Sequence, residues 1–64
     1  MTSNQEKQAV HFAQLLADGF KCTGVELTCA AVYFDYARER AESLCLGTKI
    51  KPRKVMNMGM ELLA

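Results

Sequence analysis

The chain has 64 residues, half of them hydrophobic, and its eight Lys and Arg against seven Asp and Glu give a formal net charge of +1. This length suits one domain with one small core, and the apolar content excludes a disordered chain. A net charge this small gives no overall attraction to DNA or to an anionic membrane, so any electrostatic binding surface must be local.

Several classes of protein are excluded by local features of the sequence. No run approaches the ~18 apolar residues of a membrane span. Residues 1–8 are polar and lack the apolar core of an export signal. Cys22, Cys29 and Cys45 are an odd number without a CxxC pair, which argues against a disulfide framework and against a zinc site. We expect a reduced cytoplasmic protein without a metal or another cofactor.

A first helix is predicted over residues 4–18. Ser3 and Glu6 have the spacing of a capping box, in which each side chain satisfies a free backbone N–H at the start of a helix. Gly19 is placed to end this helix, because glycine readily adopts the left-handed conformation that closes a helix. Between these signals the apolar residues repeat as on the buried face of an amphipathic helix: Ala9, Phe12, Ala13 and Leu16.

The longest predicted element is a central helix over residues 24–46. Thr23 and Glu26 form a second capping-box pair at its start, and Gly47 follows it as a closing glycine. One apolar seam runs along the whole helix with alternating spacings of three and four, and it consists of Leu27, Ala30, Phe34, Ala37, Ala41 and Leu44.

The predicted length of this central helix indicates a homodimer. About 23 residues span ~35 Å, whereas a compact chain of this size has a radius of gyration of about 11 Å and a diameter of roughly 28 Å. The helix would extend beyond its own globule, and a second copy would cover the extending part. We therefore expect an all-α fold in one domain, residues 1–64, which forms a twofold dimer with the apolar seam as its core.

A third helix is predicted over residues 52–63. Pro52 suits the first position of a helix, where a backbone N–H is not needed. Gly59 inside the helix costs about 1 kcal/mol relative to Ala unless another backbone packs against it. Three methionines give this helix a soft, adaptable apolar surface: Met56, Met58 and Met60. Two interpretations stay open, since this surface either closes the core or binds a partner.

Two tyrosines of the central helix are further candidates for partner binding. Tyr33 and Tyr36 flank the apolar seam, and tyrosine is enriched at protein interfaces. They either form the edge of the dimer core or contact a partner. The predicted partner-binding surface consists of Tyr33, Tyr36, Met56, Met58 and Met60.

The strongest local charge lies in the turn over residues 49–54. Four cations fall within these six residues: Lys49, Lys51, Arg53 and Lys54. Cations at a helix N-terminus are suited to contact phosphate oxygens. No aromatic residue lies in the turn to stack on a base, so we interpret the turn first as a solvated segment and second as a nucleic-acid contact.

The two capping-box pairs, Ser3–Glu6 and Thr23–Glu26, in so short a chain resemble the small all-helical accessory proteins of temperate bacteriophages. The resemblance implies a non-enzymatic modulator that binds a host or phage protein in the host cytoplasm. No catalytic residue stands out in the sequence. We therefore expect a regulatory or accessory protein that acts through protein–protein interaction as a helical homodimer. The alternatives are a dimeric nucleic-acid-binding protein that uses the turn 49–54 and a subunit that completes a larger complex.

Overall fold

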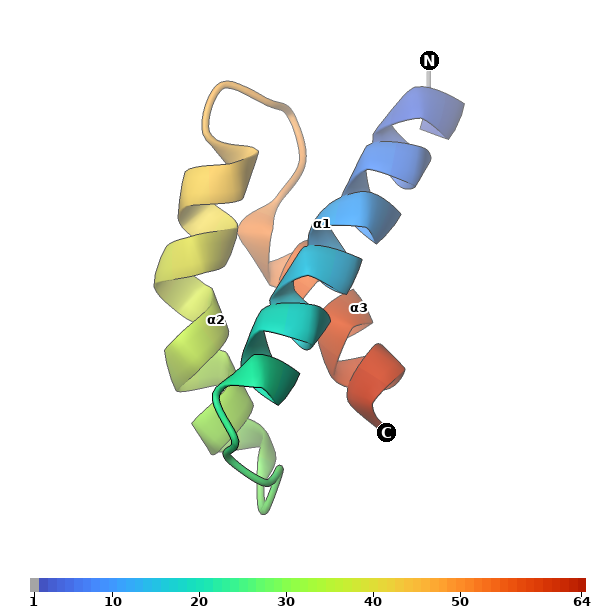
Figure 1. The fold of residues 1–64 in the computed structure, drawn as a ribbon. Coiled ribbons are helices and arrows are strands. Elements are labelled where there is room, and N and C mark those ends of the chain that lie inside the picture. The colour runs from blue at the N-terminus through green and yellow to red at the C-terminus, as the bar shows by residue number, and fades with distance from the viewer. Residues whose placement is uncertain (1) are drawn as a thin grey trace.

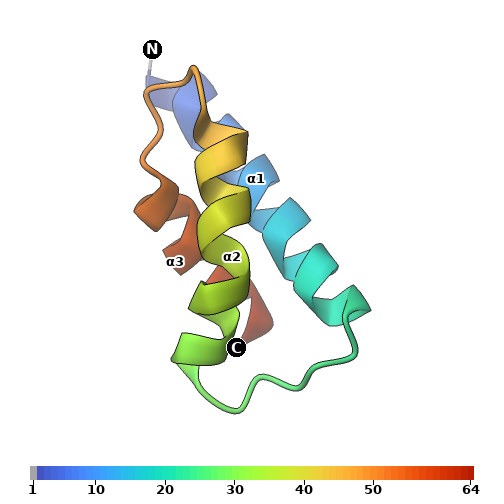
Figure 2. The same cartoon turned by 90° about the vertical axis from the view of Figure 1, so that its left-hand side faces the viewer.

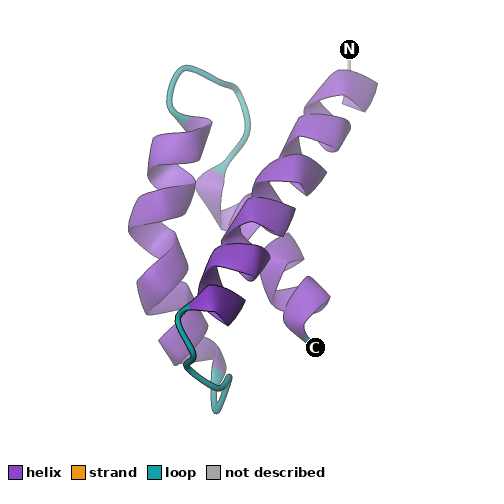
Figure 3. Cartoon of the chain, in the orientation of Figure 1, coloured by secondary structure: helices purple, strands orange, loops and turns teal. Residues whose placement is uncertain are grey.

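The chain folds into three helices joined by two connectors (Figures 1 and 3). The computed structural model describes residues 2–64, and their side chains from residue 4 onward. The helices are α1 (Thr2–Cys22), α2 (Ala30–Cys45) and α3 (Pro52–Leu63), and no strand occurs in the described residues. In Figure 1, α1 and α3 both run downward and cross each other obliquely, whereas α2 runs upward (Figures 1 and 2). The predicted all-α fold is confirmed.

The third predicted helix is confirmed at both ends. α3 begins with Pro52 in its first turn and ends at Leu63. Gly47 is also confirmed as the residue that closes α2, since its φ of 80° lies in the left-handed region that favours glycine. The chain has a radius of gyration of 11.2 Å, and it is elongated, with a longest extent of 36 Å.

The first helix is longer than predicted, because it does not end at Gly19. α1 continues to Cys22. The Tyr36 hydroxyl of α2 lies where a Cβ at position 19 would stand, so the glycine provides room for a neighbouring helix and does not end its own. Ser3 lies inside α1, and the predicted capping role of its side chain falls outside the described side chains.

The prediction of a long central helix is wrong. α2 begins at Ala30 and has 16 residues, which span about 24 Å. Thr23 does not start it but ends α1: the Thr23 hydroxyl donates a hydrogen bond to the Phe20 carbonyl at 2.6 Å. The N–H of Val25 then donates to Thr23 Oγ1. Gly24 follows with a φ of 75°, which breaks the helix. A 16-residue helix does not extend beyond its globule, so helix length no longer indicates a dimer.

In the second connector, the same two kinds of hydrogen bond end α2. The Thr48 hydroxyl donates to the Cys45 carbonyl at 2.7 Å, and the N–H of Ile50 donates to Thr48 Oγ1. In this connector the residue two positions after the threonine, Ile50, reaches the core. The corresponding residue of the first connector, Val25, stays half exposed. In both connectors, a threonine hydroxyl therefore donates a hydrogen bond back to the last turn of the preceding helix.

The core lies where the three helices face one another, and its largest fully buried side chains are Tyr33, Leu16 and Val55. Three alanines of α1 spaced four residues apart, Ala9, Ala13 and Ala17, are buried on the same side of that helix. The Ala13 carbonyl oxygen lies 3.3 Å from where a Cβ at Gly59 would stand. This confirms that another backbone packs against Gly59.

No helix of the described part is both long and apolar enough to cross a membrane.

Candidate functional site

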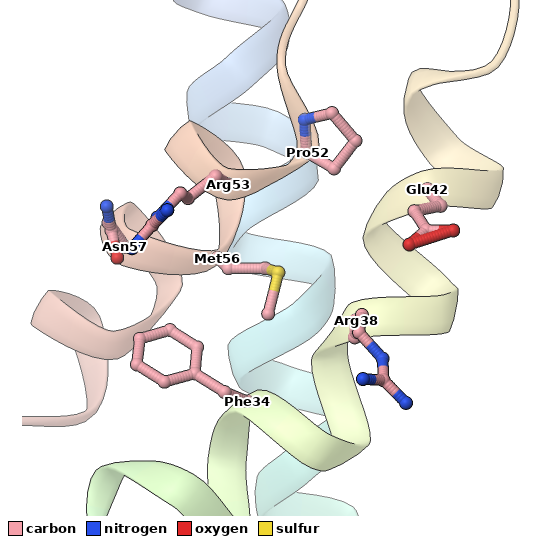
Figure 4. Close-up of a pocket in the computed structure, with 7 residues that line it drawn as sticks. All are labelled: Phe34, Arg38, Glu42, Pro52, Arg53, Met56 and Asn57. Atoms are coloured by element: carbon pink, nitrogen blue, oxygen red, sulfur yellow. The ribbon is translucent and has the colours of Figure 1, made fainter.

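A groove with a volume of about 430 Å³ lies between α2 and α3 (Figure 4). Phe34 and Met56 provide its apolar floor from the two helices, and the Met56 side chain extends from α3 toward α2. We call it the α2–α3 groove, and its lining consists of Phe34, Arg38, Glu42, Pro52, Arg53, Met56 and Asn57.

Helical spacing places these side chains along the groove. On α2, Phe34, Arg38 and Glu42 follow one another at intervals of four, so they share one face of the helix. On α3, the pairs Pro52–Met56 and Arg53–Asn57 have the same interval. The wall on each side is therefore one helical face, with an apolar residue next to polar or charged ones.

The charges around this groove are open to a binding partner. Arg38, Glu42 and Arg53 are exposed, and none of them forms an ion pair with another described residue. Two guanidinium groups against one carboxylate give the groove an excess of positive charge. Arginine pairs readily with carboxylates, since its planar fork can donate two parallel hydrogen bonds.

The two candidate tyrosines lie in different environments. Tyr33 has 0% of its surface exposed, so it belongs to the core of the chain and not to a partner-binding surface, which corrects the prediction. Its buried hydroxyl has no hydrogen-bond partner in the described structure. Burial and, second, the nearby Tyr36 raise the pKa of Tyr33 to about 12. Tyr36 is only half buried, and the Arg40 guanidinium lies 5.0 Å from the centre of its ring.

The three methionines do not form one surface. Met56 lines the α2–α3 groove, whereas Met58 lines a second groove between α1 and α3. Met60 is half buried and packs against the core. Met60 therefore helps to close the core, whereas Met56 and Met58 line hollows of the surface, and partner binding by them stays a prediction.

The predicted dimer seam is divided by the fold. Ala37 and Ala41 have no exposed surface, because they pack inside the single chain. The prediction that these two alanines belong to a dimer core is therefore wrong. Leu27 lies in the first connector and Ala30 is exposed at the start of α2. The two remaining members, Phe34 and Leu44, line different grooves.

The four cations of the turn 49–54 also line two different hollows. Lys49, Lys51 and Lys54 line a hollow on the α1 side of α3, whereas Arg53 faces the α2–α3 groove. Lys54 is engaged in an ion pair with Glu6 of α1, at 2.8 Å between Nζ and Oε1. All four cations are exposed.

The three cysteines lie in different environments. Cys45 is buried, and burial raises the pKa of its thiol. Cys22 and Cys29 are exposed at the two ends of the first connector. Among the described residues no group of three or more His, Cys, Asp or Glu is arranged to hold a metal ion.

Sequence reasoning missed Arg38, Glu42 and Asn57 as site residues. The interval of four from Phe34 to Arg38 and Glu42 indicates a shared helical face, and this signal is present in the sequence. Which face of α3 stands opposite depends on how the helices pack, and no local pattern specifies it.

No protein-family model, curated protein or solved structure gives a significant match to this chain.

Proposed function

We propose that this chain is a small accessory protein that acts through protein–protein contacts as a homodimer, and that the α2–α3 groove receives a segment of its partner. The observation that carries the proposal is the groove itself, with Phe34 and Met56 on its floor and, at its rim, arginines that pair with no other described residue. Small, partly apolar grooves between helices are common sites for an inserted helix or loop.

The composition of the groove also indicates the chemistry of the partner. Met56 and Phe34 suit apolar side chains, because methionine adapts its shape to what it contacts. Arg38 and Arg53 suit carboxylates on either side of such a side chain. The partner segment is therefore expected to be an apolar stretch flanked by Asp or Glu. The resemblance to phage accessory proteins stays a prediction.

A photo-crosslinking residue in place of Met56 tests this function in the native cells. We expect one dominant protein adduct after irradiation, identified by mass spectrometry. The matched control carries the same residue in place of Gln14, which is exposed on α1 and lies outside the grooves described here. The adduct should be absent from this control.

Charge reversal at the rim then tests whether the adduct reports the groove. Changing both Arg38 and Arg53 to Glu should reduce the Met56 adduct by about tenfold or more, since each lost ion pair weakens a partly buried contact. A Lys21→Glu variant, remote from the groove, should keep it. Equal adducts at positions 56 and 14, or an adduct insensitive to the arginine changes, would contradict the proposal.

The second candidate function is nucleic-acid binding through the turn 49–54. One observation favours it: α3 begins at this turn with no acidic residue in its first turn and no side-chain cap, so its positive end is open. Lys49, Lys51 and Arg53 remain without ion pairs among the described residues.

Retention of duplex DNA on the protein at low and moderate salt tests this alternative. Contacts to three phosphates would lower the affinity by about 40-fold between 50 and 200 mM salt, because the counterions released on binding scale with the contacts. A Lys49→Glu, Lys51→Glu double variant should abolish retention. No retention at 50 mM salt would remove this candidate.

A further inference from the structure

One side of α2 carries a row of residues at intervals of four. Phe34, Arg38 and Glu42 line the α2–α3 groove, and Leu46, which directly follows α2, continues the same interval. We call these four positions the α2 row. Residues four apart lie on the same face of a helix, one turn above the other. The α2 row therefore has an apolar residue at each end and two opposite charges at its centre.

The apolar ends of the α2 row are open to a partner. Leu46 is 83% exposed, more than any other large apolar side chain in the described part of the chain. Phe34 is half buried, packs edge-to-face on Tyr33 and forms the floor of the groove together with Met56 (Figure 4). A single exposed leucine needs no explanation. Here, however, it lies at one end of a row whose other end is also apolar.

The two central charges of the α2 row do not neutralise each other. Arg38 and Glu42 are four apart on one helix, yet they form no ion pair with each other or with another described residue. An acid that follows a base at this interval pairs less well than one that precedes it, and exposed pairs of this kind contribute little. Both side chains are exposed. Each can therefore pair with an opposite charge on another molecule.

The α2 row is complementary to itself when its direction is reversed. Phe34 and Leu46 are symmetric about position 40, and so are Arg38 and Glu42. A twofold axis at this position pairs two α2 helices in opposite directions. Each Arg38 then comes opposite the Glu42 of the other copy, and each Phe34 comes opposite the other Leu46. Twofold interfaces require such a self-complementary surface. Rows at intervals of four are also the ridges along which two helices most often pack, with their axes at about 50°.

From these observations we infer that a second copy of this chain docks on the α2 row, with reciprocal Arg38–Glu42 ion pairs between two Phe34–Leu46 contacts. The second copy is then the partner that the proposed function assigns to the α2–α3 groove, so the inference rests on that function. Because Met56 shares the floor of the groove with Phe34, the second copy comes within reach of a photo-crosslinking residue at position 56.

Exchange of the two central charges tests the reciprocal ion pairs. Size exclusion coupled to light scattering at about 100 µM should give twice the wild-type chain mass of 7.1 kDa. Arg38→Glu and Glu42→Arg should each raise the dissociation constant of the dimer by about tenfold or more, because each places like charges opposite one another at both pairs. An equimolar mixture of the two variants should recover the dimer, since one copy then carries two carboxylates and the other two guanidinium groups. The double variant should also recover it.

A change at the apolar end gives a second test. Leu46→Glu should raise the dissociation constant by about tenfold or more, because it places a charge against an apolar ring. The fold should be retained, since Leu46 is exposed in the single chain. Leu15→Glu is the matched control, because Leu15 is 45% exposed on α1 and lies outside the α2–α3 groove. It should leave the dimer intact. Circular dichroism of every variant verifies that the helices are retained.

The Met56 adduct distinguishes failure of the dimer from failure of the groove. An adduct that joins two copies of this chain supports the inference. A wild-type mass of one chain, charge variants that dimerise as the wild type does, or charge variants that do not recover when mixed would each overturn it. If Met56 then gives an adduct with a different protein, the groove keeps its proposed role in binding. If Met56 gives no adduct, the proposed function fails as well.

Discussion

Two tyrosines three residues apart on α2 make the same contact with different consequences. Tyr33 and Tyr36 both pack edge-to-face on Phe20, each with ring centres 5.5 Å apart. Each hydroxyl also lies against a helical glycine, Gly59 of α3 for Tyr33 and Gly19 of α1 for Tyr36. One side chain is enclosed and the other is half exposed. Tyr33 therefore makes the tyrosine–glycine contact inside a core, and Tyr36 makes it at a surface.

The contact between Tyr33 and Gly59 is enclosed, so its atoms have no room to move. A Cβ at Gly59 would overlap the Tyr33 hydroxyl and would also lie 3.3 Å from the Ala13 carbonyl oxygen. At Gly19 only the end of the Tyr36 side chain would be met, and that side chain can rotate toward solvent. The same substitution should therefore have unequal effects at the two glycines.

Gly59→Ala should have the largest effect. Overpacking against a buried ring costs up to about 3 kcal/mol, and the better helix propensity of alanine returns about 1 kcal/mol, so we expect a net loss near 2 kcal/mol. Urea unfolding followed by circular dichroism measures it. In a Tyr33→Phe background the loss should shrink, because the overlapping hydroxyl is gone; an unchanged loss would place the clash elsewhere.

Removing the Tyr33 hydroxyl should change the response to alkaline pH. The folded pKa is about 12 and the unfolded value is about 10, so above pH 10 the unfolded chain binds fewer protons and stability falls as the pH rises. At pH 11 this costs about 1.4 kcal/mol. Tyr33→Phe should remove this fall and, near pH 7, should be neutral or stabilising, since it deletes an unpaired buried polar group. Denaturant unfolding at pH 7 and pH 11 compares the two proteins; equal alkaline losses would contradict the assignment.

Gly19→Ala should have the smallest effect. The gain in helix propensity of about 1 kcal/mol is offset by the displacement of Tyr36, and the net change in unfolding free energy should stay within about 0.5 kcal/mol of zero. The same urea titration measures it. A loss as large as that of Gly59→Ala would mean that Tyr36 is held as rigidly as Tyr33, and the comparison would fail.

Local patterns in the sequence were sufficient for some elements of this fold. Pro52 marks the start of α3, whose predicted bounds are those of the structure, and Gly47 closes α2 as predicted. The start of α2 was misassigned because Thr23 and Glu26 fit a capping box, whereas Thr23 bonds backward to Phe20. A threonine at such a position can serve the helix before it or the helix after it, and the capping pattern does not distinguish them.

The candidate site was less accessible to prediction than the fold. Tyr33 and Tyr36 look equivalent in the sequence, because each flanks the same seam, and only the packing of α1 and α3 encloses one of them. Met56 and Met58 are two residues apart, so they lie on opposite sides of α3 and line different grooves. Both distinctions arise from the arrangement of three helices, which a single-residue pattern does not encode.

The two threonine turns also bear on how the chain folds. They stop α1 and α2 through hydrogen bonds between residues at most three apart. The residues before α2 and α3, Cys29 and Lys51, make no side-chain cap hydrogen bond. The C-terminal ends of α1 and α2 can therefore form in a chain that is still open, whereas the first turns of α2 and α3 depend on their neighbours. Native-state hydrogen exchange should follow this polarity, with early opening at the N-terminal turns of α2 and α3 and slower loss of the turns that precede each threonine.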